Sequence, residues 1–192
     1  MKEIKLDIQI YSLILRNKTK IYFASMSMPS TKRISIVSLL VIFNIFIDQL
    51  SKYFVRQNLE LHETHKYFFD LCTLTKTENT GAFLSLGSNI AEPYKSILLN
   101  LMPCLVMVYM LYFVFTKTDL SKWMVFAISC IIGGGLANLY DRLKFGSVTD
   151  FLHINFVVFD LQTGVFNVAD MSIMLGMFIF LFNGFFNEES KA

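Results

Sequence analysis

Four apolar segments, each close to the length that crosses a lipid bilayer, restrict the folds open to this chain more than any other feature. They cover residues 34–55, 96–115, 123–139 and 168–186. A helix that spans the hydrocarbon core needs about 20 mainly apolar residues, and each segment approaches this length when its polar end lies at the interface. Composition agrees, because 54% of the 192 residues are hydrophobic and only 17% are charged, which excludes an ordinary soluble domain.

Basic residues beside these segments predict how the chain crosses the membrane. Lys32 and Arg33 precede the first segment, and Lys117 and Lys122 lie in the short connection between the second and the third. Lys and Arg are concentrated in cytoplasmic loops, so the amino terminus and this connection are expected in the cytoplasm. The sequence therefore predicts an α-helical integral membrane protein with four transmembrane helices, both termini cytoplasmic, and two outer segments.

Residues 1–33 form a basic extension for which three interpretations stay open. The apolar run over 8–15 is too short to span a bilayer, and it suits an amphipathic surface helix or the core of a signal peptide. A cleaved signal would start the first span from the outside, against the basic residues just before it. A start of translation at Met26 or Met28 is the third possibility. We expect an uncleaved cytoplasmic extension or an upstream start.

The outer segment over 57–92 has the pattern of strands rather than of a helix. Threonines occupy every second position from 73 to 77, and β-branched residues favour strands. Asn79-Thr80-Gly81 then ends the run as a turn would. We expect a small extracytoplasmic β-sheet within a membrane domain over 34–187, followed by a cytoplasmic tail over 188–192.

Charge, cysteines and histidines indicate neither nucleic acid nor a bound metal. The net charge of +2 is too small for a nucleic-acid-binding protein, and three cysteines suggest no disulfide framework. His62, Glu63 and His65 lie in a polar outer segment, where such side chains are more often solvated than bound to metal. We expect no metal and no other cofactor.

Two aspartates, Asp150 and Asp170, lie where apolar segments meet polar turns. An acid at membrane depth is costly, so it usually faces a cavity or a partner and is a candidate functional residue. Two acids that flank one short excursion could meet and share a proton, as in an aspartic protease that activates water.

The position of Asp170 at the start of the fourth segment adds a second interpretation. Asn167 is a good N-cap, and Asp170 then falls at the third helical position, where an acid can bond back to the cap. Capping could be its whole role. The helix dipole also favours its charged form, so Asp170 could hold the charge while Asp150 keeps the proton.

The first segment carries its own polar pair near its outer end. Asp48 and Lys52 are four residues apart in the favourable acid-before-base order. A structural ion pair explains them.

The third segment ends in three glycines, which indicate close helix packing in lipid. Asn138, Asp141 and Arg142 follow within about one helical turn, and Asn138 shares a face with either of the others. Taken alone, these three residues favour interfacial capping and an arginine that extends toward water.

Five short motifs stand in order around the four segments. They are Asp48-x-x-Ser51-Lys52, Asn79-Thr80-Gly81-Ala82-Phe83, Gly133-Gly134-x-x-Ala137-Asn138-x-x-Asp141-Arg142, Val148-Thr149-Asp150-Phe151 and Phe166-Asn167-x-Ala169-Asp170. In this order and spacing the chain resembles the lipoprotein signal peptidases, also called signal peptidase II, over residues 34–186.

The resemblance implies an aspartyl endopeptidase of the bacterial inner membrane, with a small extracytoplasmic sheet and its active site at the outer, periplasmic face. It implies that prolipoproteins are cleaved just before a cysteine that carries diacylglycerol, without a cofactor, in contact with membrane lipid. The catalytic aspartates of the family fall on Asp150 and Asp170. Residues implied in substrate binding or in positioning these two acids are Asn79, Gly81, Asn138, Arg142 and Asn167, and residues implied in structural support are Asp48, Lys52 and Asp141.

Two other classes of protein compete with the peptidase. Intramembrane acids also mark proton relays, as in a small proton-coupled transporter. The chain lacks an evident internal repeat, and its acids lie near an interface rather than at the midplane, which disfavours this reading. A non-catalytic membrane scaffold with capped helices is the second rival.

Overall fold

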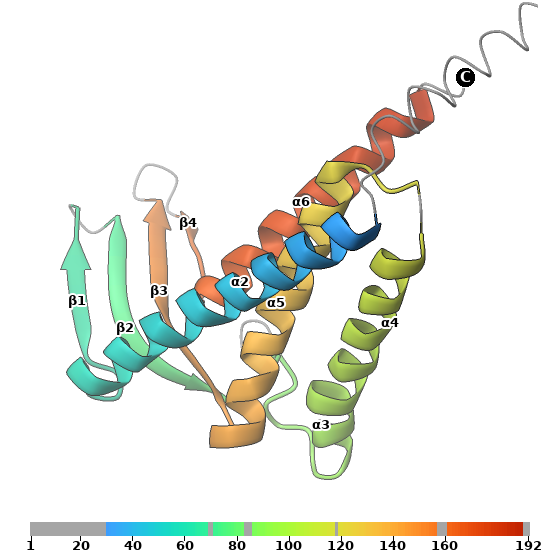
Figure 1. The fold of residues 1–192 in the computed structure, drawn as a ribbon. Coiled ribbons are helices and arrows are strands. Elements are labelled where there is room, and N and C mark those ends of the chain that lie inside the picture. The colour runs from blue at the N-terminus through green and yellow to red at the C-terminus, as the bar shows by residue number, and fades with distance from the viewer. Residues whose placement is uncertain (1–29, 69–70, 83–85, 118, 157–160, 190–192) are drawn as a thin grey trace, which may run out of the picture.

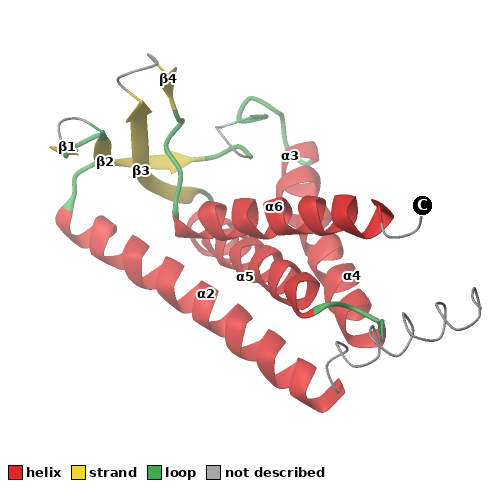
Figure 2. Cartoon of the chain, turned by 90° about the horizontal axis from the view of Figure 1, so that it is seen from above, coloured by secondary structure: helices red, strands yellow, loops and turns green. Residues whose placement is uncertain are grey.

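The described part of the protein consists of long helices with a small sheet at one end (Figures 1 and 2). The computed structural model describes residues 30–68, 71–82, 86–117, 119–156 and 161–189. Most of the predicted extension, residues 1–29, and the last residues of the predicted tail, 190–192, therefore lie outside the described residues. The prediction of a mainly helical chain with a small sheet is confirmed.

Within the described ranges, three helices are long and apolar enough to cross a membrane. They are α2 (Ser30–Asn58), the continuous helical run α3 (Tyr94–Ser96), η2 (Ile97–Leu101) and α4 (Met102–Thr116), and α5 (Lys122–Phe145). A fourth helix, α6 (Val168–Glu189), has a shorter apolar stretch within its described residues, Val168–Phe182. α2 and α5 extend beyond the predicted apolar segments 34–55 and 123–139 at both ends.

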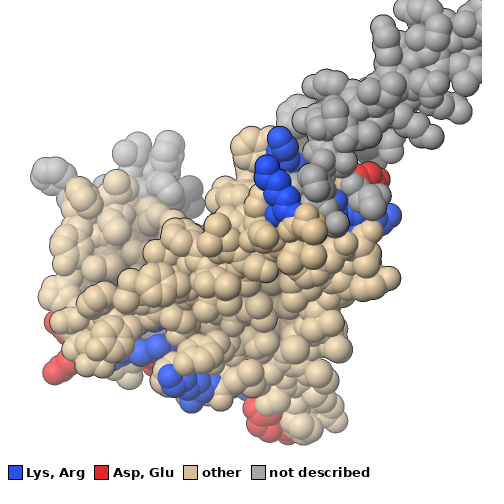
Figure 3. Space-filling view, in the orientation of Figure 1, with Lys and Arg blue, Asp and Glu red and all other residues tan. Residues whose placement is uncertain are grey.

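The outer faces of α2 and α4 carry large apolar side chains. Phe43 and Phe46 on α2 and Tyr109 and Tyr112 on α4 are all more than half exposed. Figure 3 shows a broad surface without Lys, Arg, Asp or Glu between two ends where charged side chains gather. An apolar band of this kind is unfavourable in water and is the expected surface of a protein in lipid.

Close contact between α5 and α6 holds the centre of the bundle. A Cβ atom at Gly134 would collide with the carbonyl oxygen of Ala169, and one at Gly176 would collide with that of Ala127. Glycine therefore lets the two backbones approach, as the glycine run predicts. Gly134 lies one turn before Asn138, and Ala169 lies next to Asp170, so this packing brings two predicted site residues together.

The sheet has four antiparallel strands in the order β1 (Thr64–Tyr67), β2 (Cys72–Asn79), β3 (Val148–Phe156) and β4 (Leu161–Gln162). The predicted threonine strand is β2, and it ends at Asn79 as the turn motif indicates. The second outer segment contributes β3 and β4, which the sequence pattern did not predict. Two outer segments far apart in the chain thus form one sheet (Figure 1).

An irregularity in the sheet adjoins Asp150. Leu74 pairs with Leu152 and Thr77 with Asp150, so β2 uses three steps where β3 uses two. Such a bulge bends the strand and redirects side chains, and bulges are frequent next to functional sites.

Candidate active site

Asp150 and Asp170 come from different elements and are both withdrawn from the surface. Asp150 lies on β3 with a side chain only 3% exposed, and Asp170 lies in the first turn of α6. A short connection leads from the sheet to the start of α6, so the two acids lie at the junction between sheet and helices (Figure 2).

Three asparagines surround these two acids with amide donors. Asp150 accepts hydrogen bonds from the side-chain amides of Asn167, at 2.6 Å, and Asn79, at 2.9 Å. Asp170 accepts one from the side-chain amide of Asn138, at 2.8 Å. The amide of Asn167 also donates to the oxygen of Asn138, at 3.1 Å, and so links the partners of both acids. We call these five residues the amide cluster.

Burial favours the protonated form of Asp150. It raises the pKa of the Asp150 carboxyl from 3.8 to about 6, and the neighbouring Asp170 carboxylate adds to this rise. The hydrogen bonds from Asn79 and Asn167 oppose it because they stabilise the charged form. Asp150 can therefore hold a proton near neutral pH, while the two acids remain close enough to influence each other.

The start of α6 forms the predicted capping arrangement. The amide nitrogen of Asp170 donates to the side-chain oxygen of Asn167 at 2.9 Å, and the amide nitrogen of Asn167 donates back to the Asp170 carboxylate at 3.1 Å. This reciprocal pair satisfies two backbone donors of the helix start. Asp170 thus caps its helix with one oxygen and binds Asn138 with the other.

A second buried group, the charged cluster, lies directly beside the amide cluster. It consists of Lys52 between Asp48, at 2.7 Å, and Asp141, at 2.8 Å, with Arg56 3.0 Å from Asp141. The side chains of Asp48, Lys52 and Asp141 are fully buried. The predicted pair Asp48–Lys52 is confirmed, and it is part of a larger network.

One hydrogen bond joins the charged cluster to the amide cluster, and another joins it to the first turn of α6. Lys52 donates to the side-chain oxygen of Asn138 at 2.8 Å, and the amide nitrogen of Ala169 donates to Asp48 at 2.8 Å. The charged cluster therefore fixes the orientation of the Asn138 amide, so that its nitrogen faces Asp170.

The interpretation of Asn138, Asp141 and Arg142 as interfacial caps is wrong. Asn138 and Asp141 are buried and belong to the two clusters. Arg142 donates to the carbonyl oxygen of Gly81 at 2.8 Å instead of extending into water. The amide nitrogen of Gly81 donates to Asn79, which in turn binds Asp150. The loop after β2 is thereby joined to both α5 and the acid on β3.

Sequence reasoning missed three residues at this site. Gln49 donates to Asp141 at 2.9 Å, Arg56 pairs with the same carboxylate, and Thr77 lies opposite Asp150 in the sheet. Spacing could have revealed Arg56, which continues the four-residue period of Asp48 and Lys52 on one helix face. Nothing in the sequence marks Thr77, because its place depends on pairing between distant strands.

The histidines of the first outer segment lie apart from the acids. His65 contacts Glu63 at 2.8 Å in an exposed pair, and hydrogen bonds from the backbone of Glu60 and from His65 lower the pKa of Glu63. Within the described ranges, no group of three His, Cys, Asp or Glu side chains could hold a metal ion.

Two solved structures of bacterial membrane enzymes share the fold. One, determined at 2.3 Å resolution, superposes with a TM-score of 0.74 at 23% identity and covers 83% of this chain and 93% of its own. The other, at 1.9 Å resolution, gives a TM-score of 0.69 at 24% identity over 78% and 92%.

Sequence relatives identify the family. A lipoprotein signal peptidase of Borrelia duttonii is 35% identical over 152 residues, 77% of this chain and 88% of the relative. A lipoprotein signal peptidase of Streptococcus agalactiae is 31% identical over 157 residues, 82% of this chain and 96% of the relative. The model of the family described as signal peptidase (SPase) II matches residues 40–186. With the buried acids and their amide partners in place on this fold, the chain belongs to the signal peptidase II family.

Proposed function

We propose that Asp150 and Asp170 are the catalytic pair of this aspartic-type membrane peptidase, which removes signal peptides from prolipoproteins. The observation that carries this assignment is the amide cluster, in which the buried Asp150 and the half-buried Asp170 receive hydrogen bonds from amides that bring no positive charge. Without a cation among these donors, a pair of acids resists joint ionisation and favours the form that shares one proton.

In the proposed mechanism one acid accepts a proton and the other donates one. The amide of Asn138 and the start of α6 favour the charged form of Asp170, which accepts a proton from the attacking water. Asp150 holds the proton and donates it toward the oxygen of the cleaved peptide bond. No step requires a cofactor, since both the base and the acid are carboxyl groups of the chain.

The surrounding polar residues have two proposed roles. Asn79, Gly81, Asn138, Arg142 and Asn167 bind the substrate or position the two acids, as their contacts with Asp150 and Asp170 and with the adjoining loop suggest. Asp48, Lys52 and Asp141 support these residues through the hydrogen bond that Lys52 donates to Asn138.

We further propose that the substrate is cut just before a cysteine that carries diacylglycerol. The relatives are named lipoprotein signal peptidases, which supports a lipidated precursor as substrate. The acids lie where the sheet meets the apolar helices, so a peptide could reach them while its acyl chains remain in the surrounding lipid.

The proposed topology has four spanning helices, with both termini in the cytoplasm and the acids at the outer face of the inner membrane. Lys32, Lys117 and Lys122 are exposed at the end where α2 begins, α4 ends and α5 begins (Figure 3). The positive-inside rule assigns this end to the cytoplasm. In this proposal residues 34–187 form the peptidase domain, flanked by a cytoplasmic extension (1–33) and tail (188–192).

Purified protein tests these proposals directly. Wild-type protein in lipid nanodiscs should cleave a diacylglyceryl-modified precursor at the bond before the modified cysteine, as mass spectrometry of the products would show. The matched precursor without diacylglycerol should stay intact. Absence of cleavage together with proton-driven uptake in sealed vesicles would favour the transporter instead.

A further inference from the structure

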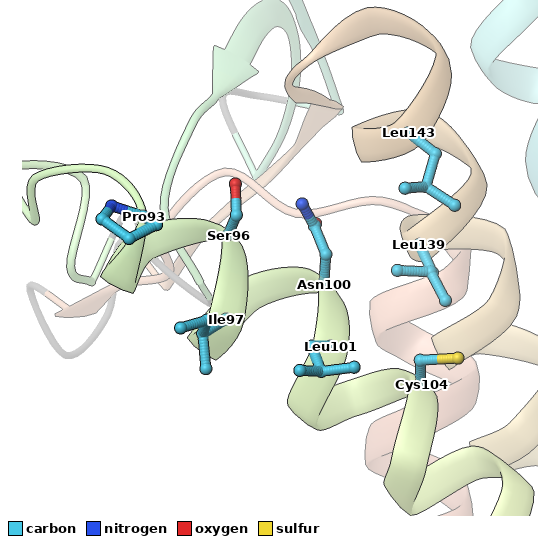
Figure 4. A pocket seen from close by; sticks show the side chains of 8 residues that line it. All are labelled: Pro93, Ser96, Ile97, Asn100, Leu101, Cys104, Leu139 and Leu143. Atoms are coloured by element: carbon cyan, nitrogen blue, oxygen red, sulfur yellow. The ribbon is translucent and has the colours of Figure 1, made fainter.

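A short helical stretch before α4 separates two cavities next to the site. On one side lies an open groove of about 380 Å³, lined by apolar side chains such as Ile97, Leu101, Leu139 and Leu143 (Figure 4). On the other side lies a smaller cavity of about 160 Å³ whose lining includes Arg142. Only Ser96 and Asn100 line both, so they form the boundary between an apolar and a polar space.

Asn100 has no evident structural reason to occupy this boundary. Its side-chain oxygen is buried and has no hydrogen-bond partner among the described residues. A buried acceptor without a partner costs stability, whereas an apolar side chain of similar size would cost nothing. Asn100 also lies in the five-residue π-helix η2, and such insertions in α-helices occur frequently at functional sites.

A second unpaired group belongs to a residue that lines the same small cavity. The Nε atom of Arg142 is buried and, within the described chain, also lacks a hydrogen-bond acceptor. Another nitrogen of this guanidinium binds Gly81, and its charge acts on both Asp150 and Asp170. Two residues that line this cavity thus each carry a buried group without a partner among the described residues, an acceptor on Asn100 and a donor on Arg142. A peptide group carries the complementary pair, an N–H and a carbonyl.

We propose that Asn100 is a positioning residue that accepts a hydrogen bond from a backbone N–H of the substrate, next to the cleaved bond. This inference rests on the proposed function and adds a substrate contact to it. Asn100 then holds the peptide from the side of α4, while the acids approach it from β3 and α6. Its partner Arg142 receives the carbonyl of the same stretch of peptide.

The test combines a change in the protein with a change in the substrate. Asn100→Leu and Asn100→Ala remove the acceptor, and Leu98→Ala, on an exposed residue of the same π-helix, is the matched control. The substrates are a diacylglyceryl-modified precursor peptide and two versions in which the amide before or after the cleaved bond is replaced by an ester. Each ester lacks one N–H and is otherwise nearly the same shape.

Both Asn100 variants should keep the thermal stability of the wild type and lose about tenfold in kcat/KM on the all-amide substrate, with Leu98→Ala unchanged. One ester substrate should be poorer for the wild type by a similar factor, and on that substrate the Asn100 variants should equal the wild type. An unchanged kcat/KM for both variants, or a loss of equal size on all three substrates, would overturn the proposal.

The same substrates separate this inference from the proposed function. Asp150→Asn should be inactive on every substrate, whatever the outcome at Asn100. Residual cleavage by Asp150→Asn would count against the assignment of the acids, while the substrate-dependent loss at Asn100 would still be readable.

Discussion

The charged cluster and the amide cluster each contain two aspartates, but the partners of these aspartates differ in charge. Asp48 and Asp141 each lie within 3 Å of the ammonium group of Lys52, and Asp141 also pairs with Arg56. Asp150 and Asp170 instead receive hydrogen bonds from the amides of asparagines. The two clusters touch, so the difference arises from the choice of donor and not from location in the fold.

This difference in partners bears on which of the acids can exchange protons. Asp48 and Asp141 share the buried ammonium group of Lys52, so the loss of either carboxylate would leave that cation with fewer partners. Asp150 and Asp170 accept their side-chain hydrogen bonds from neutral amides, and burial raises the pKa of Asp150 to about 6. The charged cluster therefore suits a structural role, and the amide cluster suits acid–base chemistry.

The largest effect is expected when each acid of the amide cluster is replaced by asparagine. Asp150→Asn and Asp170→Asn should each reduce cleavage of lipidated precursor by about 10²–10⁴-fold, because an amide can neither take a proton from water nor supply one. The folded state should persist, since an asparagine retains the shape of the side chain. Cleavage assays and thermal melts on the same preparations would check both points, and turnover within a few-fold of wild type in a folded variant would exclude that acid.

The corresponding change in the charged cluster should affect stability first. Asp48→Ala leaves the buried Lys52 with one carboxylate fewer and frees the amide of Ala169, and breaking a buried ion pair costs about 3–5 kcal/mol. We expect a lower melting temperature and a lower membrane yield, with a smaller loss in activity per folded molecule. Full stability combined with complete inactivity would contradict the structural role.

A pH series of thermal melts tests whether Asp150 retains its proton on folding. It leaves the contacts of the charged cluster in place. The pKa of Asp150 is about 6 in the folded protein against 3.8 for the unfolded carboxyl, so the folded state binds more protons between these values. The stability contributed by this group is therefore lost as pH rises from about 4 to about 6 and is constant above.

Asp150→Asn cannot lose this contribution, so its melting temperature relative to wild type should rise over the same interval. Thermal melts of both proteins in one detergent, at half-unit steps of pH, would measure the difference. A difference that stays flat from pH 4 to pH 7 would show that Asp150 does not retain its proton on folding.

The smallest effect is expected from the amino-terminal extension, which precedes all five motifs. Deletion of residues 1–25 leaves Met26 as the start and keeps Lys32 and Arg33 before α2. Topology depends mainly on basic residues close to the span, so processing of lipidated precursor should be nearly normal. Complementation of a strain depleted of its own enzyme, at matched membrane levels, would reveal any contribution of the extension through a loss of processing.

Local sequence patterns determined much of this protein. The apolar segments fixed the helices because a stretch of about 20 apolar residues has few other stable places. Side chains close in sequence also fixed their own contacts: the ion pair of Asp48 with Lys52, and the cap that Asn167 and Asp170 form at the start of α6. The glycine at position 134 indicated close packing without revealing its partner.

Only the tertiary structure decided which polar residues meet. β3 was not predicted, because strand pairing links residues more than 70 positions apart, as between Thr77 and Asp150. Asn138 and Asp141 are residue types that are typical of a helix end at the membrane interface. They are buried only because α2 and α6 pack against α5. A buried polar side chain must find a partner, and which partner it finds depends on distances that the order of residues does not contain.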